Sequence, residues 1–309
     1  MTEAKGRPQQ ILTITSMKGG VGKTTISAML ARYASEIAPR PVLVVDLDPQ
    51  AGISTILLGG KIKGPTIADI LEMEFRGVSS GGLFHQAARP SRYNDRVLVV
   101  ASGATLAHFV SPSSSPPPDL LARALQAAPI PDNALVIVDT GTAPDLVRMG
   151  VMAADTIVIP IMFSQQTARP TINTLMLASR KAGCRGALAP VGMGKTQWEK
   201  KELDRWRKQL LRDEALAAIG FGVLPPLPHS KTIVRGRWRY GAFPRRFEPF
   251  FDALYSLAVD GDRRRPTQDS SISAVNSRLP EATASSRDSE VPLMAKRHTV
   301  AQEGIRHGA

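Results

Sequence analysis

A glycine-dense loop between a predicted strand and a predicted helix constrains the fold more than any other stretch of this 309-residue chain. An apolar run ends at Thr15, and Met17-Lys-Gly-Gly-Val-Gly-Lys-Thr-Thr25 follows before a helical pattern begins. The glycines let backbone N–H groups converge without interference from Cβ atoms, and the helix adds the positive end of its dipole at the same place. The segment therefore predicts a phosphate-binding loop at the start of an α/β domain.

The side chains of this loop predict nucleotide chemistry. Lys23 supplies a mobile cation for the β- and γ-phosphates, and the Thr24 hydroxyl is a ligand for Mg²⁺. Met17 occupies the place of the first glycine in the common pattern G-x-x-x-x-G-K-[ST], and a second lysine, Lys18, stands just inside the loop. The predicted nucleotide-binding residues are Lys18, Gly19, Gly20, Val21, Gly22, Lys23, Thr24 and Thr25.

Short apolar runs alternate with helical patterns along the chain. Besides the strand before the loop, the runs predict strands at 42–46, 97–101, 134–139, 155–160 and 186–191. The intervening patterns predict helices at 25–37, 66–73, 119–127, 171–182, 197–217 and 248–259. Strands that are buried on both faces and alternate with helices form parallel sheets. We expect a single P-loop NTPase domain of the α/β class, with a mostly parallel β-sheet and helices on both faces.

Carboxylates follow two of the predicted strands, where ligands bind in open α/β sheets. Asp139 ends one strand and is expected to hold Mg²⁺ next to Thr24. Asp46 ends another, and Asp48 follows two residues later. Because these two lie on alternate sides of an extended chain, we expect one to support the water shell of the metal and the other to orient the attacking water.

The net charge of +12 favours a polyanionic partner, with nucleic acid before anionic lipid. The charge is concentrated between residues 231 and 246, where Trp238 and Tyr240 stand among six cations and no acid. The alternative to a nucleic-acid interface is a solvated basic loop. The predicted DNA-binding residues are Lys231, Arg235, Arg237, Arg239, Arg245 and Arg246.

Other features bound the class of protein. Cys184 is the only cysteine, which excludes disulfides within the chain and cysteine-ligated zinc. No run approaches the ~20 apolar residues of a membrane span, and the N-terminus has no apolar signal core, so we expect a cytoplasmic protein without membrane contact.

We expect a disordered lead-in over 1–9, one domain over 10–260 and a disordered polar tail over 261–309. In the predicted helix 197–217, a stripe is expected to pack into the core: Trp198, Leu203, Trp206 and Leu210.

Three motifs resemble those of the ParA/MinD family of ATPases, closest to the ParA/Soj-type DNA partition ATPases. Lys18-Gly-Gly-Val-Gly-Lys-Thr-Thr25 is similar to the deviant phosphate loop of that family. Asp46-Leu-Asp-Pro-Gln50 resembles its first switch, and Val136-Ile-Val-Asp-Thr140 its magnesium-binding strand. The resemblance covers about residues 10–260.

The resemblance implies a slow, Mg²⁺-dependent and partner-stimulated ATPase. Lys23 would bind the β- and γ-phosphates, and Asp48 would position the hydrolytic water. Lys18 would reach across a nucleotide-sandwich homodimer to the phosphates of the partner, which makes dimerisation part of the ATP switch. The implied catalytic residues are Lys18, Lys23 and Asp48, and the metal site consists of Thr24, Asp46 and Asp139.

Features that this chain lacks distinguish it from two subfamilies. Iron–sulfur relatives need two cysteines per subunit, and MinD-type members end in a basic amphipathic membrane helix; this chain has neither. The chain also lacks the asparagine that family members usually carry near residue 190, and ATP is still expected over GTP.

The resemblance to the ParA type implies non-specific DNA binding in the ATP dimer, a ParB-like DNA-binding partner and a nucleoid-associated location, in the segregation of plasmid or chromosomal DNA. The first alternative is another cargo, such as a conjugative-transfer or polar complex. The second is a DNA-binding regulator with ATP as a structural ligand.

Overall fold

The computed structural model describes residues 10–259, except 61, 111–115, 132, 163–167, 182, 194–196, 219 and 235–240. The predicted lead-in and tail lie outside these residues, so the domain boundaries stay a prediction. The strands are β1 (Gln10–Ile14), β2 (Val42–Leu47), β3 (Ala88–Pro90), β4 (Val97–Val100), β5 (Leu135–Thr140), β6 (Thr156–Ile161), β7 (Arg185–Met193), β8 (Phe221–Val223) and β9 (Leu227–Pro228). The α-helices are α1 (Lys23–Glu36), α2 (Gly52–Leu58), α3 (Ile67–Phe75), α4 (Gly81–Ala87), α5 (Leu120–Ala127), α6 (Pro144–Ala153), α7 (Ala168–Ala178), α8 (Gln197–Arg212), α9 (Glu214–Ala218), α10 (Lys231–Val234) and α11 (Glu248–Val259).

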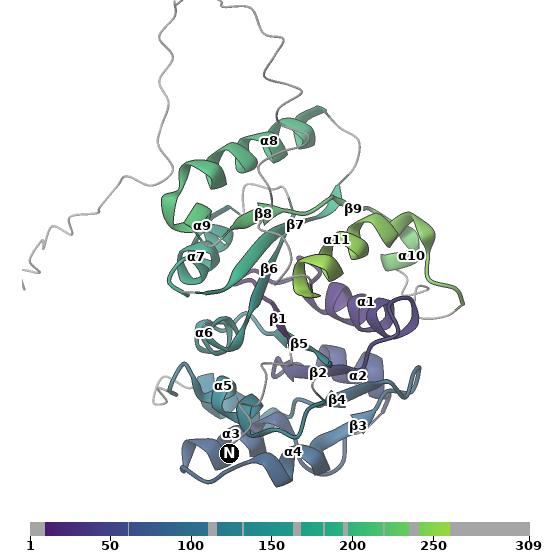
Figure 1. Ribbon diagram of the computed structural model, residues 1–309, viewed down its shortest axis with the longest axis vertical. Helices are drawn as coiled ribbons and strands as arrows, with labels where there is room; N and C mark the ends of the chain where they lie inside the picture. Colours follow the sequence, from purple (N-terminus) through teal and green to yellow (C-terminus); the bar gives the residue numbers. More distant parts are fainter. Residues whose placement is uncertain are drawn as a thin grey trace, which may run out of the picture. The chain divides into compact units, whose positions relative to one another are not determined.

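One sheet runs through the described part of the chain, in the order β3-β4-β2-β5-β1-β6-β7-β8, with β9 paired to β7 (Figure 1). Every pair is parallel except β3 with β4, so the predicted α/β class with a mostly parallel sheet is confirmed. The central strands β2, β5 and β6 are buried along their whole length, as their uninterrupted apolar sequences require. Strands β2, β5 and β1 are neighbours, which brings their carboxyl ends together.

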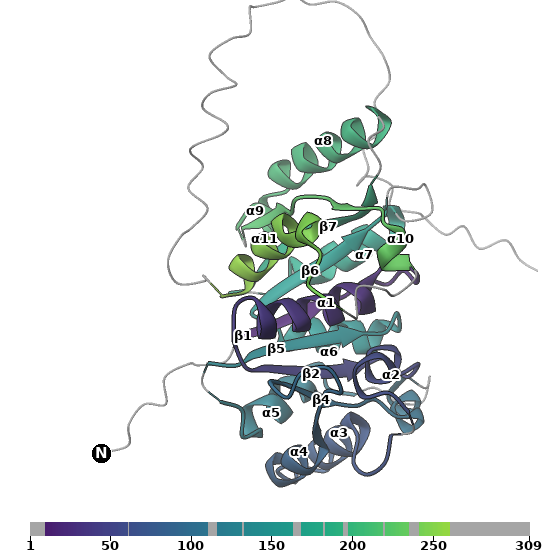
Figure 2. The ribbon, with the colours of Figure 1, turned by 90° about the vertical axis from the view of Figure 1, so that its right-hand side faces the viewer.

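Helices cover both faces of the sheet. Figure 2 shows α1, α2 and α11 in front of the strands and α6 and α7 behind them. On the front face, α1 and α11 pack in one apolar cluster, with Met29 and Phe251 fully buried. On the other face, α3, α5 and α6 pack against β2, β4 and β5, while α7, α8 and α9 pack against β6, β7 and β8.

The region between residues 197 and 218 differs from the prediction in two ways. The predicted single helix is two helices, because the Asp213 carboxylate accepts a hydrogen bond from the N–H of Leu216 and begins α9. The predicted core packing is confirmed for Leu203, Trp206 and Leu210, which are buried. It is wrong for Trp198, which is 53% exposed. Trp198 lies in the first turn of α8, outside the arc that faces the sheet.

Other element predictions are close to the observed bounds. The helix predicted over 171–182 is α7, which ends at Ala178. Thr66 caps α3 in a reciprocal capping box with Asp69, as its sequence predicts. None of the described helices is both long enough and apolar enough to cross a membrane.

Candidate nucleotide-binding site

The glycine loop joins the carboxyl end of β1 to the first turn of α1. Gly20 and Gly22 adopt φ angles of +75° and +93°, a region that side-chain-bearing residues rarely enter. Gly22 is also the N-cap of α1, so no N-cap side chain accepts a hydrogen bond from the backbone N–H groups of the first turn. The free N–H groups and the helix dipole therefore point to an anionic group, as a phosphate would require.

Lys23 folds back over this loop. Its Nζ donates a hydrogen bond of 3.1 Å to the backbone carbonyl of Lys18, and the side chain is 7% exposed. Burial lowers the pKa of Lys23, while the negative charges of Asp139 and Asp48 act in the opposite direction. A buried ammonium group with one neutral acceptor is suited to bind a phosphate oxygen in the same place.

Asp139 sits at the carboxyl end of β5, under the start of α1. Its Oδ2 accepts a hydrogen bond from Thr24 Oγ1 at 2.8 Å, and its Oδ1 accepts one from Ser27 Oγ at 2.8 Å. Burial, and then the charge of Asp46, raises the pKa of Asp139 to about 7. The charge of Lys23 and the two hydroxyls lower this pKa only in part, so a divalent metal would further stabilise the ionised carboxylate.

Asp46 is directly opposite Asp139 in the parallel pairing of β2 with β5. Its Oδ2 accepts hydrogen bonds from Ser54 N (3.0 Å) and Ser54 Oγ (2.6 Å), and its Oδ1 accepts one from Asp48 N (3.1 Å). Burial raises the pKa of Asp46 to about 6. Asp46 thus anchors the 48–54 segment to the sheet edge and adds negative charge beside Asp139.

Asp48 begins a tight turn that leads into α2. Its Oδ1 accepts the N–H of Gln50 at 3.0 Å, and its carbonyl accepts the N–H of Ala51 at 2.8 Å. Ala51 has a φ of +51°, a strained conformation for a non-glycine residue. A Cβ atom on Gly141 would lie 3.2 Å from Asp48 Oδ1, so the Asp48 carboxylate packs against the turn that follows β5.

The same segment also covers the loop threonine. A Cβ atom on Gly52 would lie 3.4 Å from Thr24 Cγ2, so the start of α2 lies against the start of α1. The structure therefore places the glycine loop, the 46–52 segment and the end of β5 at one edge of the sheet. Those are the three motifs that the sequence singled out.

The donor set fits Mg²⁺. Thr24 and Asp139 offer a hydroxyl and a carboxylate within hydrogen-bonding distance of each other, and Asp46 adds a second carboxylate. In the described chain, no group of three or more His, Cys, Asp or Glu side chains is placed to hold a metal by itself. Mg²⁺ is usually held by one or two carboxylates together with water and substrate phosphates, so this set is sufficient only when a nucleotide completes it.

Sequence reasoning missed two hydroxyls of the site. Ser27 lies three residues after Thr24, on the same face of α1, and this helical spacing could have indicated it. Ser54 bonds Asp46 from the first turns of α2, and only the fold brings these two residues together. A third polar contact, Thr140 Oγ1 to Thr15 Oγ1 at 2.9 Å, ties the end of β5 to the end of β1.

The remaining predicted residues are Lys18, whose carbonyl accepts the hydrogen bond from Lys23, and the predicted DNA-binding cations. Lys18 is half-buried, and its N–H donates to Ser16 Oγ at 3.2 Å. Lys231 begins α10 and is exposed. Arg245 and Arg246 lie in a short 3₁₀ helix before α11, where Arg246 contacts Ser230 and the ring of Phe247. The predicted DNA-binding residues Arg235, Arg237 and Arg239 lie outside the described residues.

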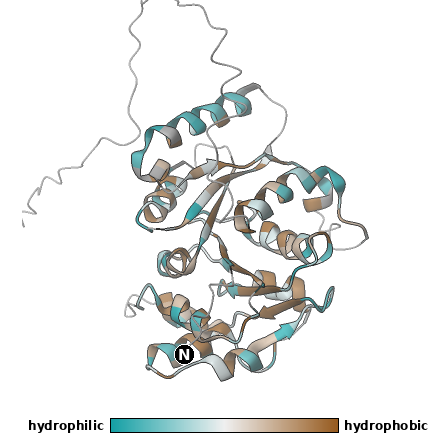
Figure 3. Cartoon of the chain, in the orientation of Figure 1, coloured by the Kyte–Doolittle hydropathy of each residue, from teal (hydrophilic) through white to brown (hydrophobic). Residues whose placement is uncertain are grey.

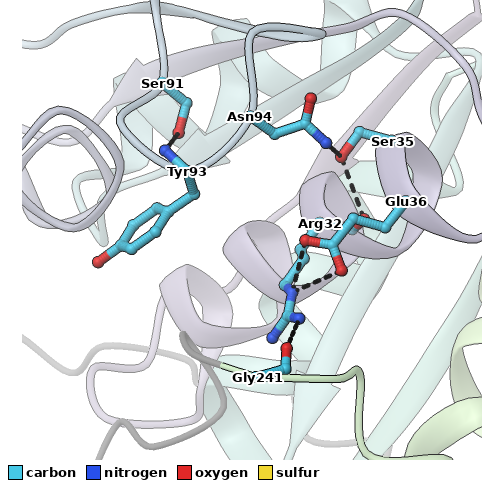
Figure 4. Close-up of polar contacts among 7 residues, drawn as sticks. All are labelled: Arg32, Ser35, Glu36, Ser91, Tyr93, Asn94 and Gly241. Atoms are coloured by element: carbon cyan, nitrogen blue, oxygen red, sulfur yellow. Dashed lines mark hydrogen bonds and ion pairs between the residues drawn. The ribbon is translucent and has the colours of Figure 1, made fainter.

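A small cavity lies at the other end of α1, and Figure 4 draws polar contacts of residues around it. Arg32 pairs with Glu36 and donates to the carbonyl of Gly241, while Asn94 donates to Ser35 at 3.1 Å. These contacts engage four polar side chains that line the cavity: Arg32, Ser35, Glu36 and Asn94. They also tie the end of α1 to the segment just before α11.

Comparison with known proteins shows the family of this chain. A family model described as the CobQ/CobB/MinD/ParA nucleotide binding domain matches residues 12–235. A virulence plasmid ParA family protein of Chlamydia psittaci is 46% identical over 44 residues, 14% of this chain and 17% of the relative. The chain spans only 12–17% of the length of the curated relatives that it matches.

Solved structures show the same fold over a longer range. A variant of McdA from Cyanothece in complex with ATP is 19% identical, with a TM-score of 0.65, over 82% of this chain and 98% of that chain. A plasmid partition protein from Borrelia burgdorferi is 18% identical, with a TM-score of 0.60, over 81% and 99%. A cobyrinic acid a,c-diamide synthase from Mycobacterium smegmatis with bound ADP and magnesium is 22% identical, with a TM-score of 0.61, over 80% and 94%.

Proposed function

Because this chain belongs to the CobQ/CobB/MinD/ParA nucleotide-binding family, we propose that it is a ParA-type ATPase that uses ATP and Mg²⁺ to switch between a dimer and a monomer. The observation that carries the proposal is the convergence of Lys23, Thr24 and Asp139 beneath an uncapped helix N-terminus. A nucleotide complex of McdA and the ADP–magnesium complex of the mycobacterial synthase support ATP and Mg²⁺ as cofactors for the same fold.

The roles of the site residues follow from their positions. Lys23 would leave the Lys18 carbonyl to bind the β- and γ-phosphates, with the loop N–H groups around them. Thr24, with Asp139 behind it and Asp46 alongside, would hold Mg²⁺, which when bound neutralises charge on the phosphates. Asp48, at the surface of the same edge, would orient the attacking water.

Lys18 would connect hydrolysis to dimerisation. It lies one residue before the exposed Gly19 and Gly20, at a surface that a second copy could approach. Contact of Lys18 with the partner's phosphates would make the ATP-bound dimer more stable than the ADP-bound one, so that hydrolysis would release it. ATP hydrolysis in this chain is therefore proposed to control dimerisation rather than to drive the synthesis of a product.

DNA is the ligand that we propose this switch binds and releases. The net charge of +12 and the basic residues between Lys231 and Arg246 support phosphate-backbone contacts without base recognition. The partition protein from Borrelia and the ParA family protein of Chlamydia support plasmid or chromosome partition, with a ParB-like partner as the stimulating factor. A different cargo, in conjugative transfer or at the cell pole, would use the same switch.

Two substitutions in one loop test the site. Lys23→Ala is expected to lower ATP affinity at least 100-fold, because it removes the cation that faces the phosphates. Lys18→Ala is the matched control: it should bind ATP as a monomer yet fail to form the ATP dimer. Isothermal titration with ATP–Mg²⁺ and sedimentation velocity measure the two effects, and ATP binding by Lys23→Ala at wild-type affinity would refute the site.

A third substitution tests the switch. Asp48→Ala is expected to bind ATP normally but to hydrolyse it at least tenfold more slowly, so that the dimer persists after ATP is added. Time-resolved sedimentation with and without non-specific DNA measures its lifetime. If wild-type protein dimerises and binds DNA without measurable turnover, the chain is instead a regulator with ATP as a structural ligand.

A further inference from the structure

Helix α8 presents one apolar and one cationic face. Leu203, Trp206 and Leu210 are buried and pack in the cluster that covers β6, β7 and β8. The rest of the helix is hydrophilic along its length, as its teal colour in Figure 3 shows. The charged side of α8 has no role in the proposed switch.

The cations of this face form a line rather than a scatter. Lys201, Arg205, Lys208 and Arg212 follow one another at intervals of four, three and four residues, which places them on one side of a helix. At ~1.5 Å per residue the line is about 16 Å long. All four side chains are exposed. We refer to these four residues as the α8 stripe.

Most of the stripe is not neutralised by neighbours. Arg205 faces Glu202 at 3.7 Å, while in the described chain Lys201, Lys208 and Arg212 form no ion pair with a carboxylate. The exposed acid of the helix, Asp204, pairs at 3.3 Å with Arg207, which lies off the stripe. The positive potential of the stripe is thus available to a polyanion outside the protein.

An exposed aromatic side chain stands at the start of the same helix. Trp198 is 53% exposed, whereas Trp206 of the same helix is buried. An apolar surface of this size beside a line of cations is suited to contact sugars or bases while the cations bind phosphates.

We propose that α8, through the α8 stripe and Trp198, binds the phosphodiester backbone of DNA. The inference rests on the proposed function, in which the chain holds non-specific DNA, and it assigns that contact to a folded helix outside the 231–246 segment. A membrane surface fits less well, because the apolar face that would enter a bilayer is already buried against the sheet.

Two triple variants with equal charge test this surface. The stripe variant carries Lys201→Gln, Lys208→Gln and Arg212→Gln. The control variant carries Arg76→Gln, Arg96→Gln and Arg123→Gln, three exposed arginines at the β3–β4 end of the sheet. Both lose three positive charges, so any difference between them reports position rather than net charge. Fluorescence anisotropy with a labelled 30-base-pair duplex, with ATP–Mg²⁺ and without nucleotide, measures binding.

The stripe variant is expected to bind the duplex at least tenfold more weakly than wild type, with a salt slope smaller by about 2–3, while the control variant changes less than threefold. Trp198→Ala should weaken binding to a single strand at least threefold. Unchanged ATP affinity in both variants, measured by titration, shows that the domain and its switch are intact.

Other outcomes overturn the inference in distinguishable ways. Equal affinity of the stripe and control variants, with wild type bound to DNA, refutes α8 as the contact and leaves the proposed function standing. Failure of wild type to bind DNA in any nucleotide state refutes both. Loss of binding to phosphatidylglycerol vesicles, but not to DNA, in the stripe variant would assign α8 to a lipid surface and refute the DNA proposal.

Discussion

Asp139 combines two demands that oppose each other at the scale of one residue. A metal site needs its carboxylate ionised, but the strand that positions it places the group among buried neighbours with Asp46 opposite. Two hydroxyls, from Thr24 and Ser27, compensate only in part, so the pKa of Asp139 is about 7. In the protein without metal, ionisation of Asp139 therefore lowers the free energy of unfolding, and bound Mg²⁺ would balance this negative charge.

This cost predicts a pH dependence of stability in the absence of metal. Because the folded state raises the pKa of Asp139, the folded protein holds the proton more tightly than the unfolded chain. Stability from this group is thus full below about pH 4 and is lost as the pH rises through about 7. Asp139→Asn removes that loss, so its unfolding free energy should exceed that of wild type by about 2–4 kcal/mol above pH 7 and by much less near pH 4.

Urea denaturation in EDTA from pH 4 to pH 8 measures the difference. Asp119→Asn, at an exposed site on α5, is the matched control and should follow wild type at every pH. A constant offset between Asp139→Asn and wild type across the whole range would contradict the assigned cause.

At the scale of elements, α1 connects the site to the core. Its first two turns carry Lys23, Thr24 and Ser27. Its last turns carry Tyr33, which packs against the aromatic residues of α11 and the segment before it. Phe251 is fully buried, with its ring centroid 6.1 Å from that of Tyr33. The position of the loop thus depends on an apolar contact at the opposite end of the helix.

Phe251→Ala is therefore expected to lower the free energy of unfolding by about 3–5 kcal/mol, because it opens a cavity in the cluster that holds α1. Phe75→Ala is the control for the same change of side chain at a surface site, since Phe75 is 55% exposed. It should shift stability by less than about 1 kcal/mol. Similar losses in the two variants, measured by urea denaturation, would show that α11 is not part of the cooperative core.

At the scale of the whole molecule, the sheet order assembles the site. The chain enters at β1, between β5 and β6, and the crossover through α1 places β2 on the far side of β5. The carboxyl ends of β1, β5 and β2 then carry the loop, Asp139 and Asp46 side by side. No single segment contains the site, so it exists only when these parallel pairs have formed.

The described core ends with α11. Because Phe250, Phe251 and Leu254 of that helix complete the apolar cluster over the sheet, we expect deletion of residues 261–309 to leave the melting temperature within about 2 °C of wild type. Differential scanning calorimetry of the full and shortened chains measures this, with ATP titration to follow the site. A drop of several degrees would place part of the tail in the folded domain.

Prediction from sequence succeeded where a requirement is local. The glycines of the loop, the apolar runs of β2, β5 and β6, and the Thr66–Asp69 capping box each depend on residues within a few positions of one another. It failed at the Asp213 break between α8 and α9 and at Trp198, because the helical pattern continues through both and only the packing against β8 decides which side faces the core.

Local sequence is enough to predict a glycine loop at the start of a parallel α/β sheet, because the backbone freedom of glycine and the uninterrupted apolar runs of buried strands are encoded within a few residues. The fold was needed to show that Ser54 bonds Asp46, that Ser27 shares Asp139 with Thr24, and that Lys201, Lys208 and Arg212 form no ion pair among the described residues. The two hydrogen bonds to Asp139 join residues 112 and 115 positions apart, and the exposure of the α8 cations depends on which face of the helix is covered. Strand order and packing, not local pattern, set both.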